Sequence, residues 1–199
     1  MNSLLRGFPA AYFAARGWVL ALLFAGLVWS RALLSRSDAP LRWEMLSILA
    51  VAMLLRAWAG AHLGPHGNGA KAEAPALATT GPYAFSRNPL YLSNIAIGTG
   101  LVFFANALSD ETTVAVLLFL FLHHVVLARW EEKHLRQTWP VEYEAYAAAT
   151  PRWFSLRPPA AAENITQTKD WSSVRARQGR NLLYVTACVL ILAVAAWVQ

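Results

Sequence analysis

The residues with the clearest chemical signal lie in the segment Thr80–Ser93, which reads TGPYAFSRNPLYLS. Asn88 is a strong helix N-cap residue, because its side-chain oxygen can accept from the first-turn N–H groups, and Pro89 suits the first helical position. A helix start carries partial positive charge and free N–H donors, which bind a carboxylate or phosphate. Arg87 adds a fixed cation that can hold a carboxylate with two hydrogen bonds. This corner is therefore predicted to bind an anion, the alternative being a capped membrane helix with an interfacial arginine.

Two adjacent carboxylates, Glu131 and Glu132, form a second candidate group. Neighbouring side chains point about 100° apart on a helix, so one is expected to face inward while the other stays in water. His124, Glu131 and His134 lie on one helical stripe. The alternative is a solvated helix end, where Glu132 and Arg136 form an exposed ion pair four residues apart.

Three histidines, His123, His124 and His134, lie near these glutamates in the sequence. Imidazole and carboxylate ligands suit zinc or iron, so a metal site must be considered. The spacing matches no compact ligand motif such as HExxH, and no metal is predicted. His123 or His124 is instead expected to make a polar contact between helices.

A fourth group follows Pro140, where the segment VEYEAYAAA leads to Pro151. It contains Tyr143 and Tyr146, and Arg152 comes directly after it. Aromatic residues at a membrane interface are usually anchors, and that is the first expectation here. The alternative is that this amphipathic segment folds back as a lid over the site.

The composition identifies the elements that must position these residues. The chain has 199 residues, of which 57% are hydrophobic and 14% are charged, whereas soluble domains carry about 25% charged residues. This is the composition of a membrane protein. The formal net charge is +6, and the basic residues flank apolar segments, which favours anionic lipid headgroups over nucleic acid as partners.

Five apolar runs predict an all-α, polytopic membrane helix bundle with about five transmembrane helices. The runs are residues 17–34, 43–63, 90–108, 113–128 and 182–198. Arg31, near the end of the first run, is expected to snorkel to the interface. Arg56 lies well inside the second run, so it is expected to face a polar partner or cavity, or to lie near the interface.

Charge asymmetry predicts the orientation. The 129–180 segment is rich in Lys and Arg, whereas the 109–112 turn has none. By the positive-inside rule, the 64–88 loop, the 129–180 segment and the N-terminus are cytoplasmic. The three arginines of the 31–42 connection, which would lie outside, oppose this orientation.

Taken together and in order, these motifs resemble the integral-membrane methyltransferases of the isoprenylcysteine carboxyl methyltransferase and phospholipid N-methyltransferase group. The hallmark of that group is similar to Arg-His-Pro-x-Tyr-x-Gly followed by a paired Glu. Here the motif reads Arg87-Asn88-Pro89-Leu90-Tyr91-Leu92-Ser93, followed by Glu131-Glu132. Asn88 replaces the histidine and Ser93 replaces the glycine, and an asparagine cannot titrate near neutral pH.

The resemblance implies S-adenosylmethionine in a pocket on the cytoplasmic side and a lipophilic or lipid-linked acceptor that arrives from the bilayer. It implies a two-span region over 1–74, a cofactor-binding core over 75–154 and a basic linker with a final span over 155–199. The residues expected to bind the cofactor are Ala76, Leu77, Ala78, Tyr83, Arg87, Asn88, Pro89, Leu90, Tyr91, Glu131 and Glu132. Glu131 is preferred over Glu132 as the acceptor for the cofactor's ammonium or ribose hydroxyls.

Methyl transfer requires alignment and exclusion of water, and no metal or covalent intermediate. A carboxylate acceptor needs no base, whereas an amine must first lose a proton. Because no residue stands out as a base, a carboxylate acceptor is slightly favoured and no catalytic residue is assigned. Two alternatives remain open: an NADPH-dependent membrane reductase of the sterol type, and a non-catalytic membrane subunit.

Overall fold

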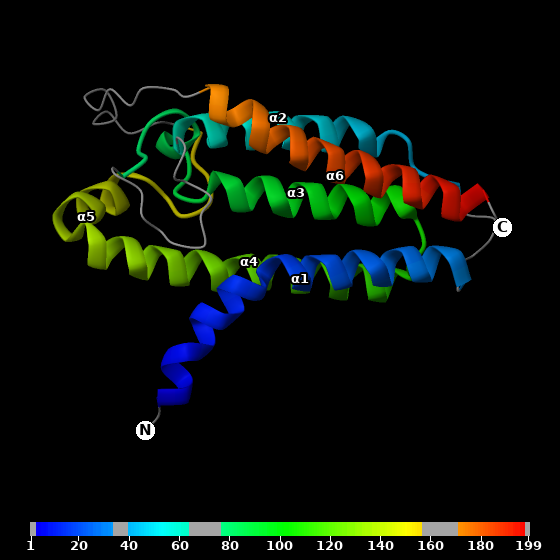
Figure 1. Cartoon of the computed structure of the whole chain (residues 1–199), viewed down its shortest axis with the longest axis horizontal. Helices are drawn as coiled ribbons and strands as arrows, with labels where there is room; N and C mark the ends of the chain where they lie inside the picture. Colours follow the sequence, from blue (N-terminus) through cyan, green and yellow to red (C-terminus); the bar gives the residue numbers. More distant parts are fainter. Residues whose placement is uncertain (1–2, 34–39, 64–76, 157–170, 198–199) are drawn as a thin grey trace.

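The structure is a computed structural model that describes residues 3–33, 40–63, 77–156 and 171–197. Every regular element in these ranges is helical, which confirms the predicted all-α polytopic bundle (Figure 1). The elements are α1 (Ser3–Leu33), α2 (Met45–Leu63), η1 (Gly81–Ala84), α3 (Pro89–Ala105), α4 (Asp110–Thr138), α5 (Pro140–Ala149) and α6 (Trp171–Trp197).

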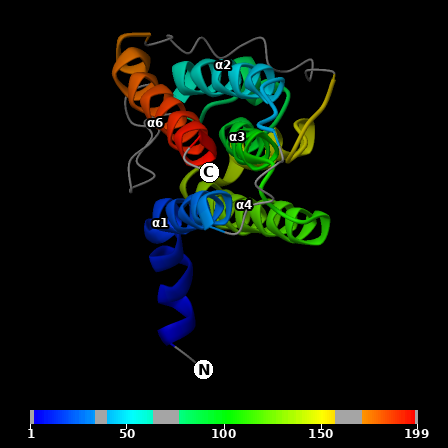
Figure 2. The same ribbon diagram turned by 90° about the vertical axis from the view of Figure 1, so that its right-hand side faces the viewer.

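Within the described ranges, four helical stretches are long and apolar enough to cross a bilayer. They are Ala15–Leu33, Met45–Leu63, Asp110–Thr138 and Gly179–Trp197. The third predicted span corresponds to α3, which has 17 residues and so extends about 25 Å, less than the roughly 30 Å of a hydrocarbon core. Figure 2 shows α3 in the middle of the bundle, where it packs against α1, α2, α4 and α6. Because protein surrounds α3, its length need not match the lipid.

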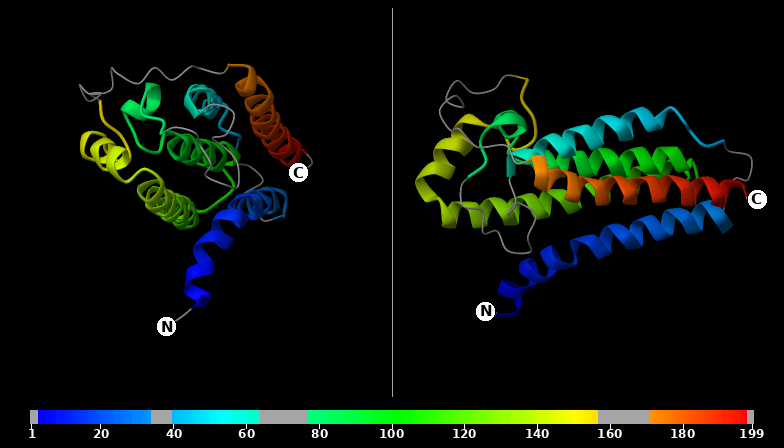
Figure 3. Two further views of the ribbon diagram at one scale, coloured as in Figure 1. Left: turned by 60° about the vertical axis from the view of Figure 1, so that its left-hand side comes forward. Right: turned by 45° about the horizontal axis from the view of Figure 1, so that its top comes forward.

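The two ends of the bundle differ in structure. In Figures 1 and 3, η1, the end of α4, all of α5 and the start of α6 gather at one end, and the start of α1 lies towards the same end but points away from the bundle. The α3–α4 turn and the end of α6 lie at the other end. The 64–88 loop, the 129–180 segment and the N-terminus are predicted to share one side of the membrane. Their described parts do lie towards one end of the molecule.

Arg31 does not snorkel, contrary to expectation. Its side chain is 3% exposed, and its Nη1 donates to the carbonyl oxygen of Ala105 at 3.2 Å. Ser30 Oγ donates similarly to Ala107 O at 3.2 Å. The last carbonyls of a helix lack intrahelical donors and carry partial negative charge, so a cation there is stabilising. Arg31 therefore stabilises the end of α3. Because this contact explains its position, Arg31 is weaker evidence against the predicted membrane orientation.

Arg56 has a polar partner inside the bundle. Its Nη1 donates to the side-chain oxygen of Asn94 on α3. Arg56 is expected to face a polar partner or cavity, or to lie near the interface. The structure shows a polar partner.

Gly81 fixes how the end of α2 meets the turn before α3. Its φ is +62°, and a Cβ at this position would lie 2.3 Å from Nε2 of His62. His62 is 7% exposed and is held by a 3.0 Å hydrogen bond from Nδ1 to Trp58 O. A side chain at position 81 would have to displace that buried ring.

Candidate functional site

The predicted helix start at Asn88-Pro89 is confirmed, since α3 begins at Pro89. The carbonyl of Asn88 accepts from the N–H groups of Tyr91 and Leu92, both at 3.1 Å. Its side chain, however, makes no capping hydrogen bond. The amide Nδ2 instead donates to Glu132 Oε1 at 3.0 Å and to Arg152 O at 3.2 Å. The predicted side-chain cap is wrong, because the amide group is turned towards a buried carboxylate, a stronger hydrogen-bond partner.

Glu132 is the centre of a buried ion cluster. Its side chain is 2% exposed, and Arg152 grips both carboxylate oxygens, with Nε to Oε1 at 2.9 Å and Nη2 to Oε2 at 2.8 Å. The hydrogen bond to Glu132 raises the pKa of Arg152. The alternative of an exposed Glu132–Arg136 pair is wrong, because Arg136 binds Glu144 on the surface at 2.7 Å.

The segment after α5 folds back over the start of α3. Arg87 N donates to Pro151 O at 3.0 Å and Ser155 N donates to Phe85 O at 2.8 Å. Ser86 Oγ adds a 3.3 Å bond to the carbonyl oxygen of Arg152. These bonds fasten residues 151–155 to residues 85–87.

Tyr143 and Tyr146 are part of the same arrangement. Tyr146 OH donates to Tyr83 O at 2.7 Å, and Tyr143 and Tyr146 are 0% and 8% exposed. The expectation that these tyrosines are interfacial anchors is therefore wrong, and the alternative fold-back is the one observed. Both rings are thus packed inside the protein, and Tyr146 ties α5 to η1.

Arg87 keeps one hydrogen-bond donor unused among the described residues. Its Nε is buried without a hydrogen-bond partner, and the ion-pair distance to Glu132 Oε1 is 3.8 Å. Tyr143 OH is also buried without a partner, and burial raises the pKa of Tyr143 to about 12, so it remains a donor at neutral pH. A buried donor that stays unpaired destabilises the fold, so these two donors fit an external acceptor such as a carboxylate.

Glu131 has a different environment from its neighbour. Its carboxylate accepts a hydrogen bond from the hydroxyl of Tyr91, and Arg16 of α1 interacts with it electrostatically. Burial raises the pKa of Tyr83 well above its ordinary value, and the charge of Glu131 raises it further. Glu132 is buried and paired with Arg152 and Arg87, whereas Glu131 is partly exposed and has the Tyr91 hydroxyl and the charge of Arg16 beside it.

The remaining predicted cofactor residues lie close by, except Ala76, which is outside the described residues. Ala78 and Tyr83 form a small buried cluster with Ala59 of α2, and Leu90 packs against this cluster. Leu77 directly precedes it. The predicted residues thus form three adjoining groups: one around Tyr83, one around Arg87 and Glu132, and one around Tyr91 and Glu131.

Arg152 is the main residue whose role the sequence does not reveal. In the sequence it only follows the segment with Tyr143 and Tyr146, whereas the structure makes it the principal partner of Glu132. The Pro-Arg-aromatic order at residues 151–153 is the signal that could have indicated a structural role.

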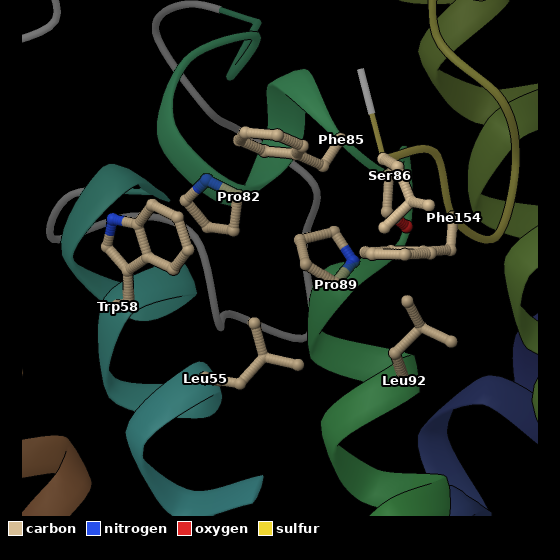
Figure 4. Close-up of a pocket in the computed structure, with 9 residues that line it drawn as sticks. Leu55, Trp58, Pro82, Phe85, Ser86, Pro89, Leu92 and Phe154 are labelled. Atoms are coloured by element: carbon tan, nitrogen blue, oxygen red, sulfur yellow. The ribbon is translucent and has the colours of Figure 1, made fainter. Parts of the chain in front are cut away.

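An apolar cavity of about 270 Å³ lies beside the start of α3 (Figure 4). Its lining residues are Leu55, Trp58, Pro82, Phe85, Ser86, Pro89, Leu92, Phe154 and Leu156. Figure 4 shows side chains of α2 on one side and of α3 on the other. Trp58 and Phe154 on its rim are 42% and 62% exposed. The cavity therefore opens at the surface beside α2 and Phe154, and its apolar lining suits an alkyl chain.

The histidines do not assemble a metal site in the part of the chain that the structure describes. His123 makes the expected polar contact between helices, since its Nδ1 hydrogen-bonds the hydroxyl of Tyr12 on α1. His124 does not, because its Nδ1 bonds to Leu120 O of its own helix at 2.8 Å.

Comparison with known proteins adds information at the level of the family. Residues 43–141 match the family model described as phospholipid methyltransferase, and this range contains α2, α3 and α4. The nickel-cobalt-cadmium resistance protein NccN of Alcaligenes xylosoxydans xylosoxydans is 36% identical over 80 residues, which is 39% of this chain and 35% of that protein. The match thus spans about a third of the length of this curated relative. No solved structure gives a significant match.

Proposed function

Because the chain belongs to the phospholipid methyltransferase family of membrane proteins, we propose that it transfers a methyl group from S-adenosylmethionine to a lipophilic acceptor. The observation that carries this proposal is the buried, unused Nε donor of Arg87 beside the first turn of α3. A fixed cation and a helix start together bind a carboxylate, which the methionyl part of the cofactor provides.

The chain's own residues divide the binding between them. Arg87 and the first turn of α3, which contains Pro89 and Leu90, hold the carboxylate. Glu131, with the Tyr91 hydroxyl, accepts from the ammonium group or the ribose hydroxyls. The aromatic faces of Tyr83 and Tyr91 suit a sulfonium cation. The cofactor supplies an electrophilic methyl group, and the protein aligns it and keeps water out.

Glu132 acts through its neighbours in this proposal. Its ion pair with Arg152 fastens the 151–155 segment to the helix start, and its hydrogen bond from Asn88 orients the amide. Ala78, which packs with Ala59 of α2, and Leu77 before it line the cofactor; Ala76 keeps its predicted role as a cofactor residue but lies outside the described residues. The domain plan of 1–74, 75–154 and 155–199 is part of the same proposal.

The acceptor reaches the site from the bilayer, with its alkyl or prenyl chain in the cavity between α2 and α3. The cavity is lined by Phe85, Ser86 and Pro89, which flank Arg87 and Asn88 in the sequence. An alkyl chain held in the cavity therefore brings its polar end close to the anion corner, the predicted anion-binding site at Arg87, Asn88 and Pro89. In this proposal the end of the bundle with the site faces the cytoplasm, where S-adenosylmethionine is available, as the positive-inside rule predicts.

Binding of S-adenosylhomocysteine to the purified protein in nanodiscs tests the proposal. Saturable binding is expected, and Arg87→Ala should weaken it roughly 10- to 100-fold, because a charged hydrogen bond contributes about 1.5–3 kcal/mol. Arg136→Ala is the matched control, since that arginine pairs with Glu144 on the surface, and it should bind like wild type. No binding by well-folded wild-type protein would refute the proposal.

A further inference from the structure

His124 carries an unused hydrogen-bond acceptor in the interior of the bundle. The residue is 0% exposed, and its Nδ1 lies 2.8 Å from Leu120 O. A carbonyl oxygen only accepts, so Nδ1 must carry the ring proton, and Nε2 of the neutral imidazole is a bare lone pair. Nε2 is buried and has no hydrogen-bond partner among the described residues.

The neighbouring histidine, His123, also has a buried Nε2 without a hydrogen-bond partner among the described residues, but its contacts do not fix which nitrogen carries the proton. His123 is also buried, at 2% exposed, but its Nδ1 bonds to the hydroxyl of Tyr12. A phenol can donate or accept, so this contact does not fix which nitrogen of His123 carries the proton. Of the two histidines, only His124 has a hydrogen bond that fixes its tautomer, with the proton on Nδ1 and the lone pair on Nε2.

The position of His124 connects it with the proposed cofactor site. His124 and Glu131 are seven residues apart on one stripe of α4, about two turns. Tyr91 of α3 bridges them: its ring lies edge-on to His124 with centroids 5.7 Å apart, and its hydroxyl donates to Glu131. Arg56 of α2 interacts electrostatically with His124 from a third helix.

A buried hydrogen-bond acceptor without a donor destabilises a fold. The Nε2 lone pair of His124 is therefore expected to receive its donor from a bound ligand. We propose that His124 is the general base for an amine acceptor, an inference that rests on the proposed function. An amine is protonated at neutral pH and cannot attack until it loses that proton. A carboxylate acceptor, which the sequence slightly favoured, would have no use for this lone pair.

The step balances as a proton transfer followed by substitution. An N–H bond of the acceptor's ammonium group breaks, the proton bonds to Nε2 of His124, and the electron pair remains on the acceptor nitrogen. That pair forms the new bond to the transferred methyl carbon, while the pair of the broken carbon–sulfur bond stays on sulfur. The imidazolium of His124 then releases its proton to water.

The decisive variant is His124→Asn, because the asparagine amide can still donate to Leu120 O but has no atom in place of Nε2. His123→Asn is the control, since it keeps a partner for Tyr12. The probes are nanodiscs containing phosphatidylethanolamine as the amine and N-acetyl-S-farnesylcysteine as the carboxylate. His124→Asn should bind S-adenosylhomocysteine like wild type and transfer methyl groups to phosphatidylethanolamine at least about 100-fold more slowly. His123→Asn should stay within about threefold of wild type, a loss far smaller than removal of a general base causes.

The outcomes separate this inference from the proposed function. Three results would overturn the inference and leave the cofactor site intact. They are wild-type rates in His124→Asn, methyl transfer to the carboxylate probe alone, and no methyl transfer at all by protein that binds S-adenosylhomocysteine. Absence of S-adenosylhomocysteine binding in wild type would remove both. ¹⁵N NMR of histidine-labelled protein gives a readout without turnover: the His124 signal should show an unprotonated Nε2, and a protonated Nε2 would overturn the inference even if variants failed to fold.

Discussion

Glu131 and Glu132 show how adjacent residues of one type acquire different roles. The 100° between successive helical side chains directs Glu132 towards Arg152 and Asn88, and Glu131 towards Tyr91. Glu132 is gripped by a bidentate arginine, whereas Glu131 accepts from one neutral hydroxyl and interacts with Arg16 only electrostatically, which leaves it lone pairs for a ligand. The chemistry of the paired Glu motif therefore depends on what α3 and the 151–155 segment bring to each face of α4.

The Glu132–Arg152 ion pair should contribute to stability as well as geometry. Arg152→Ala leaves a buried carboxylate without its bidentate partner, and we expect it to lower the free energy of unfolding by about 2 kcal/mol. Thermal unfolding in detergent measures the effect. Arg136→Ala breaks an exposed pair, which contributes about 0–1 kcal/mol. Equal losses of Tm in the two variants would show that Glu132 does not depend on Arg152.

Among the elements, the turn from η1 to α3 determines where the anion corner lies. Gly81, with its left-handed backbone, lets η1 pack directly on His62 at the end of α2. The bonds from residues 151–155 then hold the other side of the turn. The start of α3 is thus fixed from both sides before any ligand binds.

Substitution of this glycine should disturb the site through the fold. Gly81→Ala combines a strained φ with a clash against a buried ring, and we expect a loss of about 1–3 kcal/mol in the free energy of unfolding. Affinity for S-adenosylhomocysteine should fall with it. Gly26→Ala is the control, because a Cβ there meets nothing within 4 Å and the change favours helix by up to about 1 kcal/mol. A Gly81→Ala protein as stable as wild type would rule out the packing described here.

The apolar runs and helix-start signals predicted the membrane helices and several of their starts, but not η1 or the early starts of α1 at Ser3 and α6 at Trp171. The start of α3 at Pro89, the extension of α4 beyond residue 128 and the new helix at Pro140 all follow from local sequence. The partners could not be predicted in the same way. Arg152 meets Glu132 only because the chain reverses after α4, and Arg31 meets Ala105 only because α1 packs beside the end of α3. Such pairings depend on tertiary packing, which local patterns do not specify.

In the molecule as a whole, the polar chemistry lies at one end of an apolar bundle. The short helix α3 packs against four other helices (Figure 2). The site at its start is therefore built on an element inside the bundle. The apolar cavity beside this site opens at the surface beside α2 and Phe154. This arrangement suits a water-soluble cofactor from one side and an acceptor from the membrane.

The proposed orientation predicts labelling by an impermeant maleimide. In a Cys188→Ser background, Asp110→Cys marks the α3–α4 end and Glu142→Cys marks the α5 end, and both native side chains are exposed. Intact cells should label only the cysteine at 110, and permeabilised cells should label both. Labelling of position 142 in intact cells would reverse the orientation and place the site outside the cytoplasm.

The most direct measurement is transfer of a radiolabelled methyl group from S-adenosylmethionine to the lipid extract of membranes that contain the protein. The extract contains every membrane lipid, so transfer is detected whichever lipid accepts the methyl group. Wild-type protein should label a lipid-extractable product, and Arg87→Ala, at equal amounts of folded protein, should label little of it. An unlabelled extract from folded wild-type protein, or equal labelling with Arg87→Ala, would contradict the assignment of this corner to S-adenosylmethionine.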